Sequence, residues 1–408
     1  MGRLTARAAL AALVGLLGAH PLAAQTDEGA QRIARDLTPL VERASGLTFR
    51  RPAVISVRTR EQVRQYLNRK MAHEYPPAEL AAVQRAYRAF RLIPDTLDLR
   101  RLILDLYAEQ VAGFYDPDSA TLFVVRGADP AMLRLVMAHE LVHALQDQYM
   151  PLNRILQLRR QNDRQMAGQA VAEGQATLAS MMALAPGMDL PDLSQAWGMI
   201  RQAIREQQSA MPVFAAAPLL LQESMIFPYL GGAEFMRGFE ERRSRPDEQP
   251  WGDRLPVSTE QILHPSKYTS GERPVRLSFT PTAGDTAVWD DDFGEFETRA
   301  ALMSWGAAEP DAVAAAAGWN GDRYEVRGGS GGTVVLWATA WDSLQDAQDF
   351  ARLLRRQWER AVLGRTGDQR WQVDTLTVSG TLLVRLTDAP SGWSGWSRLP
   401  AVRVGPWR

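Results

Sequence analysis

The stretch His139-Glu140-Leu141-Val142-His143 places two metal-binding side chains and one proton acceptor within five residues. On an α-helix, residues four apart lie on the same face, so both imidazoles can bind one metal ion at about 2.0–2.1 Å. Glu140 directly follows the first histidine and can act as general base toward a water that the metal activates. The chain has only five histidines in 408 residues, so this spacing is unlikely to arise by chance. The alternative is a pair of helical histidines hydrogen-bonded inside a core.

A catalytic zinc usually has three protein ligands and one water, so a third ligand must come from elsewhere in the chain. His73, Asp147 and Glu173 are the candidates. His73 lies in an amphipathic helical region, where a surface or capping role is its alternative. Asp147 lies one further turn along the helix of the motif. That position is too far along the axis for an ion held between His139 and His143, and it suits an ion pair or a supporting role better.

Glu173 is the preferred third ligand. It lies 30 residues after His143 (173 − 143), on a predicted helix that can pack antiparallel beside the helix of the motif. A glycine inside a helix costs about 1 kcal/mol relative to alanine, so close approach of the two helices would explain Gly174. The other neighbours are also small, namely Ala170, Ala172 and Ala176. We therefore predict one Zn²⁺ held by His139, His143 and Glu173, against the alternative of Glu173 as a surface residue.

Helices and one hairpin are expected to position these side chains. Residues 130–149 are predicted to form the helix of the motif, which is apolar nearly all round and therefore buried. Residues 163–185 are predicted to form the helix that carries Glu173. Residues 113–125 indicate a β-hairpin around an Asp-Pro-Asp-Ser turn. Two further helices are predicted at residues 193–211 and 235–243, with residues 227–232 separating them.

The composition excludes several classes of function. The chain is 46% hydrophobic and 23% charged, which is ordinary for a soluble globular protein. The formal charge of −1 argues against nucleic-acid binding, which normally requires a basic face. The absence of cysteine excludes disulfides, thiolate zinc sites and a cysteine nucleophile. Residues 328–332 are rich in glycine but lack the strand-to-helix pattern of a phosphate loop.

The first 24 residues have the pattern of a secretory signal peptide. Arg3 and Arg7 precede an apolar run at residues 8–19, and Leu22-Ala23-Ala24 forms a small-residue cleavage site. The apolar run is shorter than the about 20 residues that span a bilayer comfortably, although an uncleaved anchor is the alternative. We expect a periplasmic or extracellular protein without stable membrane insertion after signal removal.

The pattern along the chain predicts an α+β protein. Residues 1–24 are the expected signal, residues 25–274 a mainly helical domain with a small β-hairpin or sheet, and residues 275–408 a smaller α+β domain of unknown role. Strands are predicted in that last part at residues 333–340, 372–378 and 381–386, around a helix at residues 343–361. Its tryptophans are more typical of core anchors than of a ligand platform, namely Trp319, Trp337, Trp341 and Trp358.

HExxH on one helix, followed by a glutamate on the next, resembles the gluzincin metallopeptidases, the thermolysin-like group. Residues 139–148 with Glu173-Gly174-Gln175-Ala176 are more closely similar to a set of poorly characterised exported bacterial proteins in that superfamily. The hairpin at residues 113–116 and residues 258–268 also resemble that set, so the match covers roughly residues 97–268.

The resemblance implies a zincin-like catalytic fold for residues 25–274, with zinc bound by His139, His143 and Glu173 and with Glu140 as base. It also implies that the hairpin before the metal helix offers an edge strand to an extended peptide. In thermolysin-like enzymes a carboxylate four residues after the glutamate ligand steadies a histidine. Here Thr177 stands at that position. The support must then come from elsewhere, with Glu109 or a backbone carbonyl as candidates.

These residues favour an exported zinc metallopeptidase that hydrolyses peptide bonds in a peptide or protein substrate by a zinc-activated water, with Glu140 as general base. The tetrahedral oxyanion needs a further donor, for which His264 is the first choice and Tyr229 the second, with Tyr268 a third candidate. The alternative is a non-catalytic exported binding or envelope protein that retains a metal-stabilised gluzincin fold. A metal-free helical scaffold is the remaining reading. The intact Glu140 favours catalysis, because a structural zinc would not need it.

Overall fold

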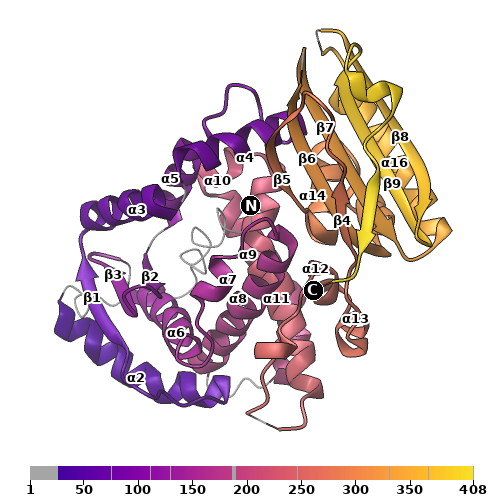
Figure 1. Ribbon diagram of the computed structural model, residues 1–408. Coiled ribbons are helices and arrows are strands. Elements are labelled where there is room, and N and C mark those ends of the chain that lie inside the picture. The colour runs from indigo at the N-terminus through magenta and orange to yellow at the C-terminus, as the bar shows by residue number, and fades with distance from the viewer. Residues whose placement is uncertain are drawn as a thin grey trace.

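The protein has a helical N-terminal part and a C-terminal part rich in strands, which confirms the predicted α+β class (Figure 1). The computed structural model describes residues 26–407 apart from residues 75, 111, 129, 186–189, 246, 330 and 366. The signal peptide expected at residues 1–24 therefore lies outside the described residues. No helix within the described ranges is long and apolar enough to cross a membrane.

The N-terminal part is built from helices, most of which were expected from sequence. The long ones are α2 (Asp27–Ser45), α3 (Arg60–Glu74), α4 (Pro77–Ala89), α5 (Leu99–Gln110), α6 (Pro130–Gln146), α8 (Asn162–Leu184), α9 (Leu190–Ser209) and α11 (Leu219–Arg242). Short helices connect them, namely α7 (Asn153–Leu156), α10 (Pro212–Ala216), α12 (Thr259–Leu263) and α13 (Pro265–Ser270). Most described residues of α6 and α8 are buried, so these two helices form the centre of this part.

A small sheet lies beside α6. Its strands β1 (Val54–Arg58), β2 (Gly113–Asp116) and β3 (Thr121–Val125) lie in the order β1-β3-β2. The predicted hairpin is the antiparallel pair β2–β3, in which Tyr115 lies opposite Leu122. Strand β1 pairs in parallel with β3. Strand β2 is therefore an edge strand of this sheet, next to the helix of the metal motif.

Helix α11 differs from the prediction of a helix at residues 235–243 preceded by a break at residues 227–232. It runs without a break from Leu219 to Arg242 and contains Pro228. The glycines that suggested a loop instead allow close helix packing, because a Cβ on Gly232 would lie 1.9 Å from the carbonyl oxygen of Ala170. A Cβ on Gly174 would likewise lie 2.1 Å from the backbone of Gly232. Gly174 thus allows α8 to approach α11, rather than α6 as expected.

The C-terminal part contains a five-stranded antiparallel sheet in the order β5-β6-β7-β9-β8. Its strands are β5 (Thr286–Asp291), β6 (Trp319–Gly329), β7 (Gly332–Trp341), β8 (Gln369–Val378) and β9 (Thr381–Pro390). The pair β4 (Arg276–Phe279) and β10 (Val402–Gly405), and the helices α14 (Gly294–Ser304), α15 (Glu309–Ala316) and α16 (Leu344–Ala361), complete this part. Figure 1 shows α16 lying along the sheet. The predicted strands and helix of this region are all present.

One hydrophobic core joins the two parts of the chain. Phe90 and Tyr229 from the helical part belong to the same buried cluster as Phe293 from the C-terminal part. The four tryptophans predicted as core anchors are at most 2% exposed, and all belong to this cluster: Trp319, Trp337, Trp341 and Trp358. The domain boundary at residues 274 and 275 stays a prediction, and the shared core shows that the two parts pack tightly.

Candidate metal centre

Helices α6 and α8 carry the three predicted metal ligands to one point. The Nε2 atoms of His139 and His143 lie 3.1 Å apart. One carboxylate oxygen of Glu173 lies 3.1 Å from the Nε2 atom of His139 and 3.2 Å from that of His143. All three side chains are buried, so their ligand atoms converge away from bulk solvent. The three residues form a group able to hold a metal ion, as predicted.

The shape of this triangle fits a small tetrahedral cation. Ligand atoms around a tetrahedral centre with bonds of about 2.0–2.1 Å lie about 3.3–3.4 Å apart. The three observed separations, 3.1 to 3.2 Å, are close to that value. Two imidazole nitrogens and one carboxylate oxygen also form a donor set that borderline metals such as zinc accept. The spacing of the three ligand atoms and their chemical types therefore both fit a small cation such as zinc.

The electrostatics of the group favour a positive charge beside Glu173. Burial opposes the ionisation of Glu173, but the two histidines outweigh it and lower the pKa of its carboxyl to about 2. Burial likewise opposes the charging of His143, yet the carboxylates of Glu173 and Glu140 raise its pKa to about 9. Burial lowers the pKa of His139. A positive charge beside the Glu173 carboxylate is therefore favoured, and either a proton on His143 or a bound cation could supply it.

Glu140 is held by the edge strand rather than by another side chain. The backbone N–H of Tyr115 in β2 donates to a carboxylate oxygen of Glu140 at 2.7 Å. Burial raises the pKa of Glu140 well above its usual range, whereas the charge of His143 opposes that rise. A cation at the neighbouring ligand group would favour the ionised carboxylate. Glu140 therefore lies beside the metal-binding group and is bonded to β2.

The proposed oxyanion donors lie in different surroundings. Tyr229 on α11 stacks on His139 with ring centroids 5.8 Å apart. Burial, and then the carboxylates of Glu173 and Glu140, raise the pKa of Tyr229 well above its usual value. Its hydroxyl faces the carboxylate of Glu173, but it makes no hydrogen bond of acceptable geometry among the described residues. The ring of His264, in contrast, pairs with Glu295 at 2.9 Å, and the structure gives it no contact with the metal-binding group.

Support for His143 comes from Gln146, which sequence reasoning missed. The Oε1 atom of Gln146 lies 2.8 Å from Nδ1 of His143. Glu109, one predicted candidate for this role, instead accepts from the backbone N–H groups of Val213 and Phe214. A signal was available, because a polar residue three positions after His143 lies on the same face of an otherwise apolar helix.

Of the two other candidate ligands, Asp147 falls outside the group, and His73 stays a prediction. Asp147 accepts hydrogen bonds from the hydroxyl of Tyr115 at 2.9 Å and from the backbone of Leu152 at 2.8 Å, so it fastens the end of α6 to the hairpin and the following loop. The side chain of His73 lies outside the described residues.

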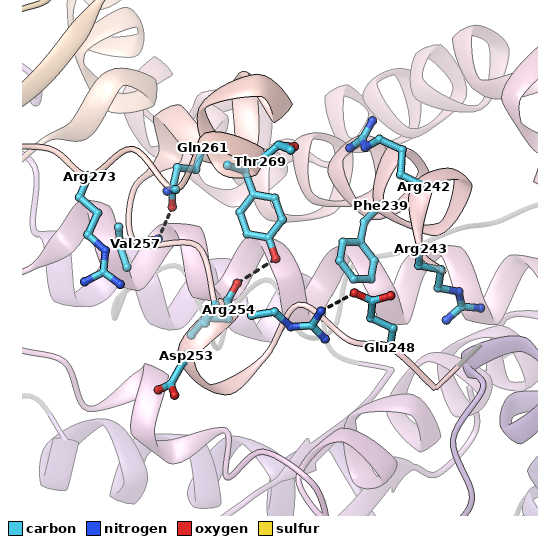
Figure 2. A pocket seen from close by; sticks show the side chains of 13 residues that line it. Phe239, Arg242, Arg243, Glu248, Asp253, Arg254, Val257, Gln261, Thr269 and Arg273 are labelled. Atoms are coloured by element: carbon cyan, nitrogen blue, oxygen red, sulfur yellow. Dashed lines mark hydrogen bonds and ion pairs between the residues drawn. The ribbon is translucent and has the colours of Figure 1, made fainter. Parts of the chain in front are cut away.

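A separate pocket of about 380 Å³ lies at the C-terminal end of α11 and contains none of the metal-binding side chains. Figure 2 shows Arg254, which lines this pocket, paired with Glu248. The carbonyl oxygen of Arg254 accepts from the hydroxyl of Tyr268 at 3.0 Å. Tyr268, the third oxyanion candidate, therefore belongs to this pocket. Arg242, Arg243 and Arg273 also line it.

Comparison with known proteins gives limited matches. Residues 282–391 match a family model described as Domain of unknown function (DUF8575). Comparison with curated proteins finds no match. Among solved structures, a protein of novel fold from Chloroflexus aurantiacus, provisionally described as a hydrolase, is similar at 16% identity with a TM-score of 0.37. The alignment covers 66% of this chain and 97% of that chain. The family match lies in the C-terminal part, away from the metal-binding residues.

Proposed function

We propose that this chain is a zinc-dependent metallopeptidase that cleaves peptide bonds in a peptide or protein substrate. The observation that carries the proposal is the convergence of His139, His143 and Glu173 with Glu140 beside them. Three protein donors leave a further position open in a tetrahedral site, which is the arrangement of catalytic rather than structural zinc. The resemblance of these motifs to the gluzincin metallopeptidases supports the same reading.

Glu140 is the proposed proton acceptor and donor. When bound, zinc supplies a Lewis acid that acidifies water near neutral pH and polarises a carbonyl. Glu140 takes a proton from the attacking water and passes it to the departing amine. The N–H of Tyr115 holds one oxygen of the Glu140 carboxylate at 2.7 Å, which fixes the direction from which the proton is taken.

Tyr229 is the proposed donor to the oxyanion. Its hydroxyl is buried, lies near the carboxylates of Glu140 and Glu173, and has no partner of acceptable geometry among the described residues. A neutral hydroxyl can donate a hydrogen bond to the charge that develops on the carbonyl oxygen. The structure therefore favours Tyr229 over His264, whose ring is engaged by Glu295.

Strand β2 is the proposed docking edge for an extended peptide. The N–H of Val125 donates to the carbonyl oxygen of Ala112, and bonded pairs alternate along an antiparallel ladder. Gly113 and Tyr115 therefore direct their backbone groups toward the outer edge of the sheet, and the Tyr115 N–H bond to Glu140 agrees with that direction. Because Glu140 takes the N–H of Tyr115, a peptide added at this edge would bond to the backbone of Gly113 and the carbonyl oxygen of Tyr115, beside the base and the metal-binding group.

We also propose that the protein is exported to the periplasm or the cell exterior, since residues 1–24 have the pattern of a secretory signal. The formal charge of −1 gives no basis for a nucleic-acid partner. N-terminal sequencing of the protein from the culture medium or periplasm would test this, and a start at Gln25 is expected. Intact protein in the cytoplasm would contradict it.

The proposed activity is tested by incubating the purified protein with a mixed peptide library and analysing the products by mass spectrometry. Cleavage is expected, with loss on treatment with a zinc chelator and recovery on adding zinc back. Stoichiometric zinc without any cleavage would instead favour the non-catalytic binding protein. Cleavage that persists after complete zinc removal would contradict the mechanism.

A further inference from the structure

A chain of buried glutamines begins at the metal ligand His143 and crosses the helical part. Gln146 donates through Nε2 to the Gln175 side chain at 2.9 Å. Gln175 in turn donates to the Gln249 side chain at 2.7 Å, and Gln249 donates to the carbonyl oxygen of Ser45 at 3.3 Å. All three glutamines are at most 7% exposed, so water does not compete easily for these bonds.

The hydrogen bonds between these glutamines have a fixed donor-to-acceptor direction, because the backbone carbonyls at their ends can only accept hydrogen bonds. The Nε2 atom of Gln146 lies 2.9 Å from the carbonyl oxygen of Ala172, so the amide group must point its nitrogen there. Its oxygen then faces Nδ1 of His143 at 2.8 Å. An amide oxygen accepts only, and therefore Nδ1 must carry the proton. A neutral His143 is thus held with an unprotonated Nε2, the atom that faces Glu173.

The far end of the chain is also anchored. A guanidinium nitrogen of Arg254 donates to the carbonyl oxygen of Gln249 at 2.6 Å. Arg254 is itself paired with Glu248, as Figure 2 shows. The segment that presents Gln249 is therefore fastened at its backbone. A reversed amide at Gln146 would place its oxygen against the carbonyl oxygen of Ala172. Reversing the other two glutamines as well would place the oxygen of Gln249 against the carbonyl oxygen of Ser45.

The two histidine ligands differ in this respect. Nδ1 of His139 is buried and has no hydrogen-bond partner among the described residues. His139 is instead restrained by its ring contact with Tyr229. Only His143 has its ring orientation and its tautomer set by hydrogen bonding.

We propose that Gln146, held by Gln175 and Gln249, is a positioning residue that fixes the Nδ1–H tautomer of His143 and so presents its Nε2 atom to the metal. The inference rests on the proposed zinc site. It assigns a role to three residues that do not contact metal or substrate. Groups of this kind commonly change metal affinity by roughly 10- to 100-fold when they are removed.

Zinc affinity measured by competition with a chromogenic chelator tests the proposal. Gln146→Met removes the acceptor and is expected to weaken zinc binding roughly 10- to 100-fold. Gln146→Glu keeps an oxygen that accepts from Nδ1–H, but its second oxygen meets the acceptors of Ala172 and Gln175. Its zinc affinity is therefore expected to lie between those of Gln146→Met and the wild type. Gln165→Met is the matched control, since Gln165 is a buried glutamine on α8 that donates to the carbonyl oxygen of Leu156. It is expected to lose stability without losing zinc affinity.

A second readout reports the tautomer directly. The zinc-loaded protein labelled with ¹⁵N-histidine has only five histidines, so its ring signals are few. A slowly exchanging Nδ1–H signal from His143 is expected in the wild type, and Gln146→Met should shift it and speed its exchange. An unprotonated Nδ1 on His143 in the wild type would overturn the proposal.

The outcomes separate this inference from the proposed function. If the wild type binds one zinc and Gln146→Met binds it equally tightly, the role of Gln146 is wrong and the metal site stands. If the wild type binds no zinc, the proposed function fails and this inference fails with it. Should Gln146→Met not fold, Gln175→Met carries the test, with zinc binding expected to weaken about three- to tenfold. Unchanged affinity in that variant would overturn the proposal.

Discussion

Helix α8 carries two buried carboxyl groups whose pKa values are shifted in opposite directions. Near the middle of the helix, the pKa of Glu173 is lowered to about 2. At its first turn, the pKa of Asp163 is raised to about 8. Both residues are at most 4% exposed, so burial alone cannot separate their pKa values. The difference must come from their partners.

The partners of Asp163 are neutral donors and other carboxyl groups. Burial raises its pKa first, and bonds from the N–H and hydroxyl of Thr259 oppose the rise. Asp322 and Glu297 nearby raise the pKa further. Asp322 itself accepts from the backbone N–H groups of Phe293 and Gly294, both at 2.9 Å. This cluster joins the start of α8 to the C-terminal sheet, so its role is structural.

The partners of Glu173 are two imidazoles that can share a cation. The comparison shows that an acidic residue in a core indicates a metal site only where donors of the right kind converge on it. The cluster of Asp163, Asp322 and Glu297, here called the acidic junction, has several carboxyl groups but no histidine among the partners described for Asp163. The following variants probe the contrast, in order of decreasing expected effect.

Glu173→Gln should remove the charge that holds the metal. Zinc affinity is expected to fall by at least about 100-fold, because a neutral amide oxygen is a poor zinc ligand. Asp163→Asn is the matched variant on the same helix and should retain one zinc per chain. Metal analysis after dialysis measures both. Zinc retained by Glu173→Gln, or lost from Asp163→Asn, would break the distinction between the two regions.

Tyr229→Phe should lower turnover by about 100-fold with little change in KM, since the lost hydroxyl acts mainly in the transition state. Zinc content should not change. Steady-state kinetics on a cleaved peptide measures the effect, with Tyr268→Phe as control, because the hydroxyl of Tyr268 donates to Arg254 in the separate pocket. A large loss in His264→Asn instead would transfer the role to His264.

Gly232→Ala should destabilise the protein by roughly 2–4 kcal/mol, because the added methyl would meet the backbone of Ala170 where α8 and α11 touch. Urea unfolding measures this. Gly198→Ala on α9 is the control, since nothing lies within 4 Å of the added Cβ. That variant should be neutral or stabilising by up to about 1 kcal/mol. Similar effects of the two variants would show that the α8–α11 contact is looser than described.

The acidic junction should make stability fall as pH rises. Asp163 has a folded pKa of about 8, above the about 3.9 of an unfolded aspartate. Between these values the folded state keeps a proton that the unfolded state releases, so stability decreases up to about pH 8 and then levels off. Asp163→Asn should remove roughly 3–6 °C of the fall in melting temperature between pH 5 and pH 8. Equal slopes in both proteins would contradict the raised pKa.

The ligands and the hairpin were predictable because their signals are local. His139 and His143 are one helical turn apart, and Glu173 lies among small residues on the next long helix. The Asp-Pro-Asp-Ser turn within residues 113–125 identified the hairpin. These features depend on spacing within one or two elements, which the sequence displays directly.

The features that were missed depend on contacts between distant segments. Gln146 meets Gln175 from another helix, and Gln249 comes from a loop 74 residues further along the chain. The choice between Tyr229 and His264 depends on how α11 packs on α8. Pro228 and the following glycines were read as a break, because the close contact that explains Gly232 is visible only in three dimensions.

The most direct test of the zinc-dependent hydrolytic site compares the wild type with Glu140→Gln for both zinc content and peptide cleavage in the same samples. Glu140 is not among the three metal-binding side chains, so its loss should spare the metal and remove the base. One zinc per chain is expected in both proteins, with turnover in the variant reduced by about 10³-fold or more. Absence of zinc from the wild type, or full turnover in the variant with zinc bound, would contradict it.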